Sequence, residues 1–599
     1  MGDPDYDGPT RVGLSGYCDD VDVPNGLGPA AGHHKLYIQT VTVLNRPARS
    51  RRTLRAQFLS TVALSSDVKI FGAYKIMSGS GTAEFSLGAT CRRLWQGGLI
   101  RLPPEYSPRV MPIKACLMVW CADGMAMGDV CGTNTSFSKA VNPCNTCEDF
   151  DQRVQAKRKP CSVLACLCGD GDRHAPACPC HFRLRTPARD LAKPPHTAAE
   201  RRAQGLRPGV TPGLKDIPGF NLAQPGPKDT MHTLNEGRTS QLAAVTCWRI
   251  AYEGLATPEQ LQRRASTFDW TPGASHAFRP NYLPDKIFVK TKLVQPDGSF
   301  IWGPHKDINI PGSAAGVTTF TIMANEFFRP FISTQDPVPS WYRMWLEHRA
   351  GFLMTLRFRL TYGEILIMEK HFIQSEDLVT ADPRYADLWI PKAHWTLHLA
   401  HDTFLYGPLR LLTTLLNEMK NARFKAGAKR SNFHNPVKDV ALFWAKQSDY
   451  ELQTLSVSSS ACEAAEQAVL ICGRASSFTD STAARLLLEH SIVGPTSQLD
   501  FLSCVKFHGV PMNRTDYVLF DDTVYNISRL IRANSQYYML LLEVAPSLCV
   551  DEYDSYFVSD VMPTDPASRF VHLCNTCAMT CFWCIPVPPE SRLYLVPKF

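Results

Sequence analysis

Apolar and polar positions alternate in the first 150 residues in the way that β-strands require. Segments 11–23 and 57–64 follow this pattern, and segment 113–122 (IKACLMVWCA) is apolar almost throughout. A continuous apolar run suits a strand that is covered on both faces, and helices supply such cover. Residues 10–145 are therefore predicted to form an α/β sheet with one helix.

The pattern changes twice further along the chain. From about residue 148 to 228, Lys, Arg, Pro, Gly, Cys and His dominate without periodicity, which predicts a loop held by something other than a core. Apolar residues then recur at helical spacing, which predicts a mainly α middle region. The helical segments are 234–252, 324–331, 341–362, 362–372 and 409–425.

The last 150 residues are predicted to contain a linker and a small β domain. Segment 451–500 is rich in Ser and Ala, which is typical of a linker. Strand-like runs follow it, and no internal repeat is found. The runs are 516–531, 536–544, 555–560 and 592–598.

Length and composition indicate a globular protein of several folding units. A chain of 599 residues corresponds to about three to four ordinary domains. With 44% hydrophobic and 20% charged residues, it is too apolar for a disordered chain and too interrupted for a membrane protein. The net charge of +7 is mild, so any nucleic-acid-binding surface must be local. The start, MGDPDYDGPT, has no signal-peptide pattern, so we expect an intracellular protein.

Two acidic groups lie where predicted strands end. Asp19, Asp20 and Asp22 stand in GYCDDVDVPNGLG, where three close carboxylates either share a cation or form a solvated turn. Asp123 follows the most apolar strand, at the position where open α/β sheets bind ligands. The alternative for Asp123 is an ordinary Asp-Gly turn.

A third acidic residue, Glu418, lies in the predicted helix 409–425. It shares a stripe with Leu411, Leu415 and Ala422 and has no Lys or Arg three or four residues away. We expect it to face inward or to border the core, where a partly buried carboxylate needs a metal ion or another partner. The alternative is a solvated helix residue.

Cysteines cluster in a way that indicates metal binding. The 21 cysteines are too small a share of 599 residues for a secreted disulfide scaffold, but ten of them lie between Cys116 and Cys180. Cys144-x-x-Cys147 and Cys178-x-x-His181 together have the spacing of a four-ligand structural zinc site. Other candidate ligands nearby are Cys161, Cys166, Cys168 and Cys180. A second cluster, Cys574, Cys577, Cys581 and Cys584, has ligand spacing too, but core cysteines are an equal alternative there.

Basic residues concentrate in two places. RPARSRRTLR contains Arg51 and Arg52, and KNARFKAGAKR follows Glu418 directly. The second group would put phosphate-binding charge beside an acidic site, as DNA cleavage requires, although a solvated helix face is the alternative. Its candidate DNA-binding residues are Arg423, Lys425, Lys429 and Arg430. No Walker A, Rossmann, Gly-x-Ser-x-Gly or kinase signature is present.

Several segments, taken in order, resemble one protein family. They are CDDVDVPNGLG, GHHKL, LSSDVKIFG, the apolar strand ending in Asp123, NPCNTC, PKDTMHTLNEG, IPKAHWTLHLA with YGPL, and the Glu418 helix. This order is similar to the transposase core of CACTA (En/Spm-type) elements, and most similar to related transposon-derived proteins of animal genomes. The resemblance extends from about Tyr17 to Trp444.

The resemblance implies an α/β RNase H-like core with a DDE/D active site. A long, mainly α-helical insertion with the Cys/His-rich loop would interrupt this core, and a small C-terminal β domain would follow. The implied division is 1–147, first part of the core; 148–228, zinc-binding loop; 229–405, helical insertion; 406–450, closing helices of the core; 451–500, linker; and 501–599, β domain.

It also implies residue roles. Asp19, Asp123 and Glu418 would be the catalytic carboxylates, holding Mg²⁺ or Mn²⁺, with Asp20 or Asp22 as alternatives for the first. Zinc would be structural. KDTMH, with Asp229, His232 and the following Glu236, matches a family motif of unknown role, in which His232 would bind zinc or orient the site.

The function implied is metal-dependent cleavage and strand transfer of DNA by a nuclear protein. Its expected partners are DNA and further copies of itself, with no membrane and no small-molecule substrate. Such proteins often carry a Cys/His DNA-binding region upstream, and only 18 residues precede Asp19, so we expect that region to be missing. Two alternatives follow. One is a domesticated, inactive DNA- or chromatin-binding protein, and the other is a zinc-stabilised interaction protein.

Overall fold

The computed structural model describes most of the first 456 residues and the strands that follow them. The described residues are 10–23, 34–44, 57–71, 73–77, 86–101, 110–131, 197, 211–214, 216–222, 224–268, 270, 282–295, 297–332, 337–357, 360–388, 390–429, 435–456, 469–471, 475–476, 499–502, 504–507, 510–513, 517–520, 523–533, 536–545, 549–550, 556–558, 568–572, 580–586 and 593–597. The chain forms two compact units. The first comprises residues 1–266, 280–318 and 331–451, and the second comprises residues 267–279, 319–330 and 452–599.

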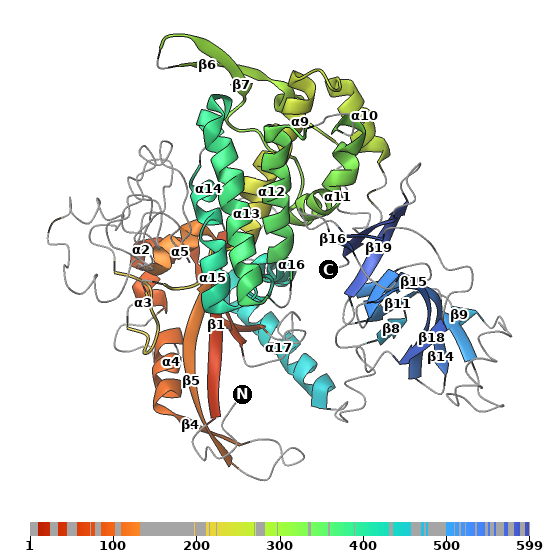
Figure 1. The fold of residues 1–599 in the computed structure, drawn as a ribbon. Helices are drawn as coiled ribbons and strands as arrows, with labels where there is room; N and C mark the ends of the chain where they lie inside the picture. The colour runs from red at the N-terminus through yellow and green to blue at the C-terminus, as the bar shows by residue number, and fades with distance from the viewer. Residues whose placement is uncertain are drawn as a thin grey trace, which may run out of the picture. The chain divides into compact units, whose positions relative to one another are not determined.

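The first unit is built on a five-stranded mixed sheet (Figure 1). Its strands are β1 (Thr10–Val23), β2 (His34–Val43), β3 (Gln57–Leu64), β4 (Gly98–Arg101) and β5 (Val110–Cys121), in the order β3-β2-β1-β5-β4. Strands β1, β2 and β3 pair antiparallel, β5 runs parallel to β1, and β4 is antiparallel to β5. The three strands predicted from apolar patterning are confirmed as β1, β3 and β5.

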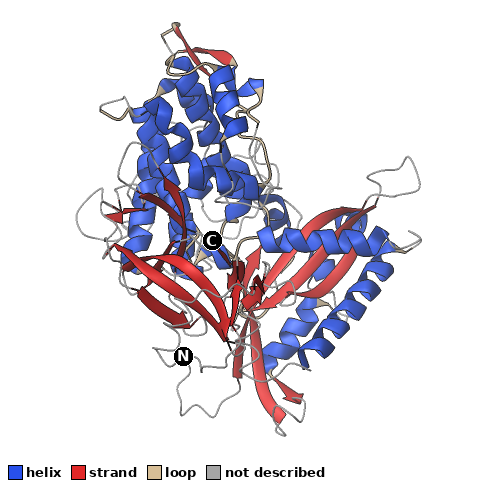
Figure 2. Ribbon diagram, turned by 90° about the vertical axis from the view of Figure 1, so that its right-hand side faces the viewer, coloured by secondary structure: helices blue, strands red, loops and turns tan. Residues whose placement is uncertain are grey.

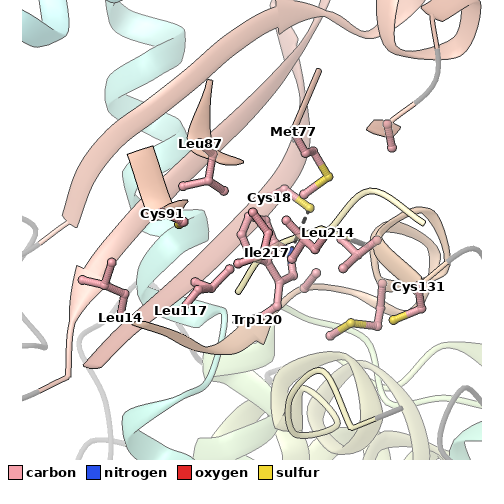
Figure 3. Packing of buried hydrophobic residues seen from close by; sticks show 14 of the residues in the cluster. Leu14, Cys18, Met77, Leu87, Cys91, Leu117, Trp120, Cys131, Leu214 and Ile217 are labelled. Carbon is pink, nitrogen blue, oxygen red and sulfur yellow. Dashed lines mark hydrogen bonds between the residues drawn. The ribbon is translucent and has the colours of Figure 1, made fainter. Parts of the chain in front are cut away.

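Four short helices cover one face of this sheet, where the sequence predicted one. They are α2 (Ser65–Phe71), α3 (Ala73–Met77), α4 (Leu87–Gln96) and α5 (Gly124–Cys131). Their apolar residues pack with Cys18, Leu117 and Trp120 of the central strands (Figure 3). Leu214 and Ile217 join the same cluster, so the end of the predicted loop 148–228 packs on the core. The sequence pattern did not predict this packing, because Leu214 and Ile217 are isolated apolar residues and form no periodic pattern.

Trp120 explains a glycine in the neighbouring strand. It is fully buried and lies opposite Gly16 in the parallel pairing of β1 and β5. A Cβ atom on Gly16 would lie 2.1 Å from the indole ring, so no larger residue fits there without movement. The indole Nε1 donates to the Cys18 sulfur at 3.3 Å, which satisfies the one polar atom of the ring (Figure 3).

Two longer helices cover the other face. Helices α16 (Leu415–Lys429) and α17 (Pro436–Ser456) contribute Phe424 and Trp444, whose rings lie 4.8 Å apart. These rings pack on Val21 of β1 and on Leu36 and Ile38 of β2. The predicted helix 409–425 is corrected, because it is broken into a short turn, η7 (Leu409–Leu411), and α16.

The middle of the chain is mainly helical, as predicted (Figure 2). Its elements are η2, a π-helix (Met231–Arg238), α9 (Thr239–Tyr252), α10 (Pro258–Thr267), η5 (Asp285–Phe288), α11 (Ala314–Ile332), α12 (Ser340–Thr355), α13 (Tyr362–Ala381), η6 (Pro383–Leu388), α14 (Pro391–Thr396) and α15 (Leu399–Tyr406). A two-stranded hairpin, β6 (Lys290–Val294) and β7 (Phe300–Pro304), was not predicted. Arg238 and Glu376 form a fully buried ion pair between η2 and α13. No helix in the described ranges has the length and apolar character to cross a bilayer.

The second unit contains the described C-terminal strands. They are β8 (Val469–Ile471), β9 (Ala475–Ser476), β10 (Leu499–Leu502), β11 (Cys504–Phe507), β12 (Val510–Asn513), β13 (Tyr517–Phe520), β14 (Thr523–Ala533), β15 (Gln536–Ala545), β16 (Cys549–Val550), β17 (Tyr556–Val558), β18 (Ser568–His572), β19 (Thr580–Pro586) and β20 (Leu593–Pro597). They form a ten-stranded and a three-stranded sheet. Strands β8 and β9 lie inside the predicted linker 451–500, so the β region begins earlier than expected.

Candidate active site

Asp19 of β1 forms a hydrogen bond that connects α16 to the sheet. Its Oδ2 accepts hydrogen bonds from the Tyr17 hydroxyl at 3.0 Å and from Nδ2 of Asn421 in α16 at 2.8 Å, and its Oδ1 accepts from the Asp20 amide at 2.7 Å. Burial raises the pKa of Asp19 above its ordinary value, and the negative charge of Asp123 acts in the same direction. Asp19 therefore lies in a partly buried, negatively charged environment.

The two neighbouring carboxylates point elsewhere. Asp20 accepts a hydrogen bond from the Ser65 hydroxyl at 2.7 Å and lies 3.6 Å from the Lys35 ammonium. Asp22 is exposed and stands opposite Lys35 in the β1–β2 pairing. Successive residues of a strand face opposite sides of the sheet, so Asp19 alone of the three faces α16.

Asp123 lies two residues after the end of β5 and directly precedes α5. Its Oδ1 accepts from the Ala126 amide at 2.6 Å, and its carbonyl oxygen accepts from the Met127 amide at 2.9 Å. These bonds are the helix-capping role of an Asp-Gly turn. Its negative charge also raises the pKa values of Asp19 and His232. Because β5 is parallel to β1 and next to it, Asp123 can cap α5 and also lie near Asp19.

Glu418 lies in the first turn of α16, and its side chain is 34% exposed. Its Oε1 is 3.3 Å from Nε2 of His232. Burial raises the pKa of Glu418 to about 7; the charge of His232 opposes this rise, and Glu236, Asp19 and Asp229 add to it. The partner that the sequence required for this carboxylate is thus an imidazole in the described structure.

Asp229 holds that imidazole. It is buried, and its Oδ2 accepts from Nδ1 of His232 at 2.6 Å, from the His232 amide at 3.1 Å and from the Thr414 hydroxyl at 2.7 Å. Its Oδ1 accepts from the Thr414 amide at 2.9 Å. Thr414 directly precedes α16, and its carbonyl accepts from the Glu418 amide at 2.9 Å. Asp229 therefore positions both His232 and the start of the helix that carries Glu418.

The pKa values of this pair follow from the hydrogen bonds. Burial alone would raise the pKa of Asp229, but the hydrogen bonds from His232 and Thr414 and the charge of His232 outweigh it, so the pKa is lowered. Burial would lower the pKa of His232, but Asp229, Glu418 and Asp123 raise it to about 9. The raised pKa favours the protonated imidazole, which lies between the carboxyl groups of Asp229 and Glu418.

Lys392 of α14 lies beside η2, at the same place. Nζ of Lys392 donates to the carbonyl of Glu236 at 2.9 Å. A Cβ atom on Gly237 would lie 2.8 Å from the backbone carbonyl oxygen of His232, so a larger residue would force the chain to shift. Burial lowers the pKa of Lys392, and the charges of Glu236, Asp229 and Asp123 oppose this change.

The segment that precedes Asp229 contacts the backbone of β5. The Trp120 amide donates to the Pro225 carbonyl at 2.7 Å, and the Tyr406 hydroxyl donates to the Gln224 carbonyl at 2.7 Å. A Cβ atom on Gly226 would lie 2.0 Å from the Trp120 carbonyl oxygen, so the two backbones are in direct contact. This contact fixes where η2 begins relative to the sheet.

No protein-family model matches the chain, and comparison with curated proteins finds no similar one. The function has to be inferred from the site itself. Asp19, Asp123 and Glu418 come from three separate parts of the chain. The charge of Asp123 acts on Asp19, the charge of Asp19 acts on Glu418, and both Asp123 and Glu418 act on His232. Within the described residues, no three His, Cys, Asp or Glu side chains are arranged to hold a metal ion.

Several predicted residues lie outside the described part of the chain. They are Arg51, Arg52, Cys144, Cys147, Cys161, Cys166, Cys168, Cys178, Cys180, His181, Arg430, Cys574 and Cys577. Arg423 and Lys429 belong to α16, but their side chains are outside the description, and Lys425 is half-buried. Cys581 and Cys584 lie in β19, opposite Val518 and Leu595. The zinc site stays a prediction.

Four site residues were missed by sequence reasoning. Tyr17 and Asn421 hold Asp19, Thr414 holds Asp229, and Lys392 lies among the carboxylates. Two signals were available. Asn421 follows Glu418 by three residues and so shares its helix face, and Lys392 stands in the IPKAHWTLHLA segment that carries the family resemblance.

Proposed function

We propose that the chain is a transposase-like protein that cleaves phosphodiester bonds in DNA and joins the freed 3′ ends to new DNA. One observation carries the proposal. Asp19 lies on β1, Asp123 follows the adjacent parallel strand β5, and α16, which is hydrogen-bonded to Asp19 through Asn421, brings Glu418 to the same side. The strand order β3-β2-β1-β5, with helices on both faces, is consistent with an RNase H-like core.

The donor chemistry fits Mg²⁺ or Mn²⁺. Both are hard cations that take carboxylate oxygens, and Asp19, Asp123 and Glu418 would hold them. The raised pKa values of Asp19 and Glu418 reflect burial together with the repulsion of nearby carboxylates. A divalent cation would remove this repulsion. In this site the carboxylates of Asp19, Asp123 and Glu418 would hold such ions, which would supply activation of water and stabilisation of the leaving 3′ oxygen of the phosphodiester.

The other residues of the site orient these carboxylates. Tyr17 and Asn421 fix Asp19 through hydrogen bonds, and the α5 amide of Ala126 fixes Asp123. Lys392 supplies a positive charge among the carboxylates, where it would help to neutralise a DNA phosphate. Each of these groups acts on binding or orientation and does not itself react.

A catalytically inactive DNA- or chromatin-binding protein is the second candidate. It is favoured by the ion pair between Glu418 and His232, and by the lack of a set of three metal ligands among the described side chains. Holding a metal ion would require Glu418 to separate from His232. A protein that keeps this ion pair would retain the architecture without the chemistry.

Nicking of supercoiled DNA separates the two candidates. Asp123→Asn should reduce Mg²⁺-dependent nicking by at least about 100-fold, because it removes a carboxylate that would stabilise the transition state, and should leave folding and DNA binding unchanged. Asp22→Asn is the matched control, since Asp22 is exposed and lies on the same strand as Asp19. Equal nicking by Asp123→Asn and the native protein would refute the mechanism, and DNA binding without any nicking by the native protein would favour the second candidate.

A further inference from the structure

The hairpin of β6 and β7 presents one face with aromatic and basic side chains. Strand alternation puts Lys290, Lys292 and Val294 of β6 on the exposed side, together with Phe300 and Trp302 of β7. The exposed fractions are 73% for Val294, 49% for Phe300 and 42% for Trp302. Both views show the hairpin at the end of the helical region (Figures 1 and 2). Five residues of this kind therefore form one exposed surface, the hairpin face.

The hairpin is anchored and preformed. On its other side Leu293 and Gly303 are buried, and a Cβ atom on Gly303 would lie 2.6 Å from the Arg384 carbonyl of η6. The Gln295 amide donates to the Ser299 carbonyl at 2.7 Å, and Gly298 has a φ of +83° in the turn between the strands. The hairpin face thus needs little ordering when it binds a partner.

Cations and rings alternate on this face. The Lys292 ammonium lies 4.0 Å from the centroid of the Phe300 ring, and the Lys290 ammonium lies 5.1 Å from that of Tyr252. The rings of Phe300 and Trp302 are 5.7 Å apart at an interplanar angle of 83°. Segments 290–294 (KTKLV) and 300–304 (FIWGP) contain no acidic residue. Within the described residues, neither lysine forms an ion pair with a carboxylate.

This combination fits an unpaired nucleic-acid strand better than a duplex. Aromatic side chains bind bases by stacking, and the flat faces of bases are accessible only where a strand is unpaired. Lysines between the rings match the negative charge of the phosphates. Two lysines alone would give a duplex little affinity. A protein partner would need acidic groups to match the lysines. A second copy of this face would instead bring lysines against lysines, and their positive charges would repel.

We propose that the hairpin face binds single-stranded DNA, with Phe300 and Trp302 stacking on unpaired bases and Lys290 and Lys292 contacting phosphates. The choice of DNA as the polymer rests on the proposed function. Strand cleavage and joining generate unpaired bases near the reacting ends, and a site for them outside the carboxylate cluster would help to hold the DNA in place. The hairpin face would position DNA and take no part in the chemistry.

Binding of a fluorescently labelled, mixed-sequence 20-nucleotide strand and of its duplex to the full chain tests this. The measurement is fluorescence anisotropy in EDTA, which excludes cleavage. Trp302→Ala and Phe300→Ala should each weaken single-strand binding by about tenfold, since stacking contributes about 1–3 kcal/mol per base. Trp302→Phe should retain most of the affinity. Phe404→Ala is the control, because Phe404 is 54% exposed on α15, away from the hairpin face.

The lysines give a second measurement. Lys290→Gln combined with Lys292→Gln should reduce the slope of log affinity against log salt by about 1.4, since each phosphate contact on a single strand contributes about 0.7. Unchanged single-strand binding in Trp302→Ala, or equal binding of strand and duplex, would overturn the proposal. So would light scattering showing that Trp302→Ala dissociates an oligomer without weakening single-strand binding. Because no step needs a metal ion, failure here is distinct from failure of the nicking test.

Discussion

Replacing Asp229 by Asn removes the charge that organises the carboxylate cluster while keeping the shape of the side chain. Asp229 is 2% exposed at its side chain and accepts four hydrogen bonds from His232 and Thr414. Three of the four end on Oδ2 and one on Oδ1. The Asn amide has one accepting oxygen and one donating NH₂ group. In either orientation, its NH₂ group therefore faces at least one backbone N–H donor and cannot accept from it.

The expected loss of stability is about 3 kcal/mol. A hydrogen bond to a charged group contributes about 1.5–3 kcal/mol, and removing one partner of a buried ion pair destabilises by about 3–5 kcal/mol. The lower end of that range applies because His232 is 24% exposed and keeps some access to water. The pKa of His232 should fall from about 9 toward the value of about 6.5 for a free imidazole, since Asp229 is the main group that raises it.

Urea unfolding measures the first effect and histidine NMR titration the second. Nicking activity should fall as well, because Asp229 fixes the start of α16 through Thr414. Asp297→Asn is the matched control. It makes the same chemical change at an exposed turn carboxylate bonded to Ser299, and its stability should stay within about 0.5 kcal/mol of the native protein. If Asp229→Asn is equally stable and His232 still titrates near 9, the positioning role is wrong.

Two further predictions concern the packing around the site. Burial and the charge of Arg238 lower the pKa of His348 to about 3, below the value of about 6.5 in the unfolded chain. As the pH decreases, the unfolded state therefore binds the proton first. Stability should fall between pH 6.5 and 3, by at most about 1.4 kcal/mol per pH unit. Urea midpoints between pH 7 and 5 should show this slope in the native protein and a smaller one in His348→Asn. Gly226→Ala should destabilise the protein by about 1–3 kcal/mol, because the new methyl group would meet the Trp120 carbonyl. The control Gly363→Ala lies in a helix with open space around it and should not destabilise the protein. Equal urea midpoints for the two variants would contradict the close backbone contact.

Local patterns predicted the elements that have strong local signals. Segments 11–23, 57–64 and 113–122 correspond to β1, β3 and β5 because alternation and continuous apolar runs extend over many residues. Helices α2 to α5 are each 5 to 10 residues long, too short for helical periodicity to stand out. The predicted helix 409–425 failed for another reason. Its break coincides with the hydrogen bonds between Thr414 and Asp229, which are 185 residues apart in the sequence.

The sequence by itself determined that carboxylates lie at the ends of two predicted strands and that Glu418 needs a partner. Period-two alternation also determined that Asp19 and Asp20 face opposite sides of the sheet. Only the tertiary structure decided which side matters, because α16 covers the face of Asp19 and its Asn421 lies 402 residues further along the chain. The same holds for the partner of Glu418. His232 reaches it because Asp229 bonds both the imidazole and Thr414, and no local pattern encodes a contact between residues so far apart.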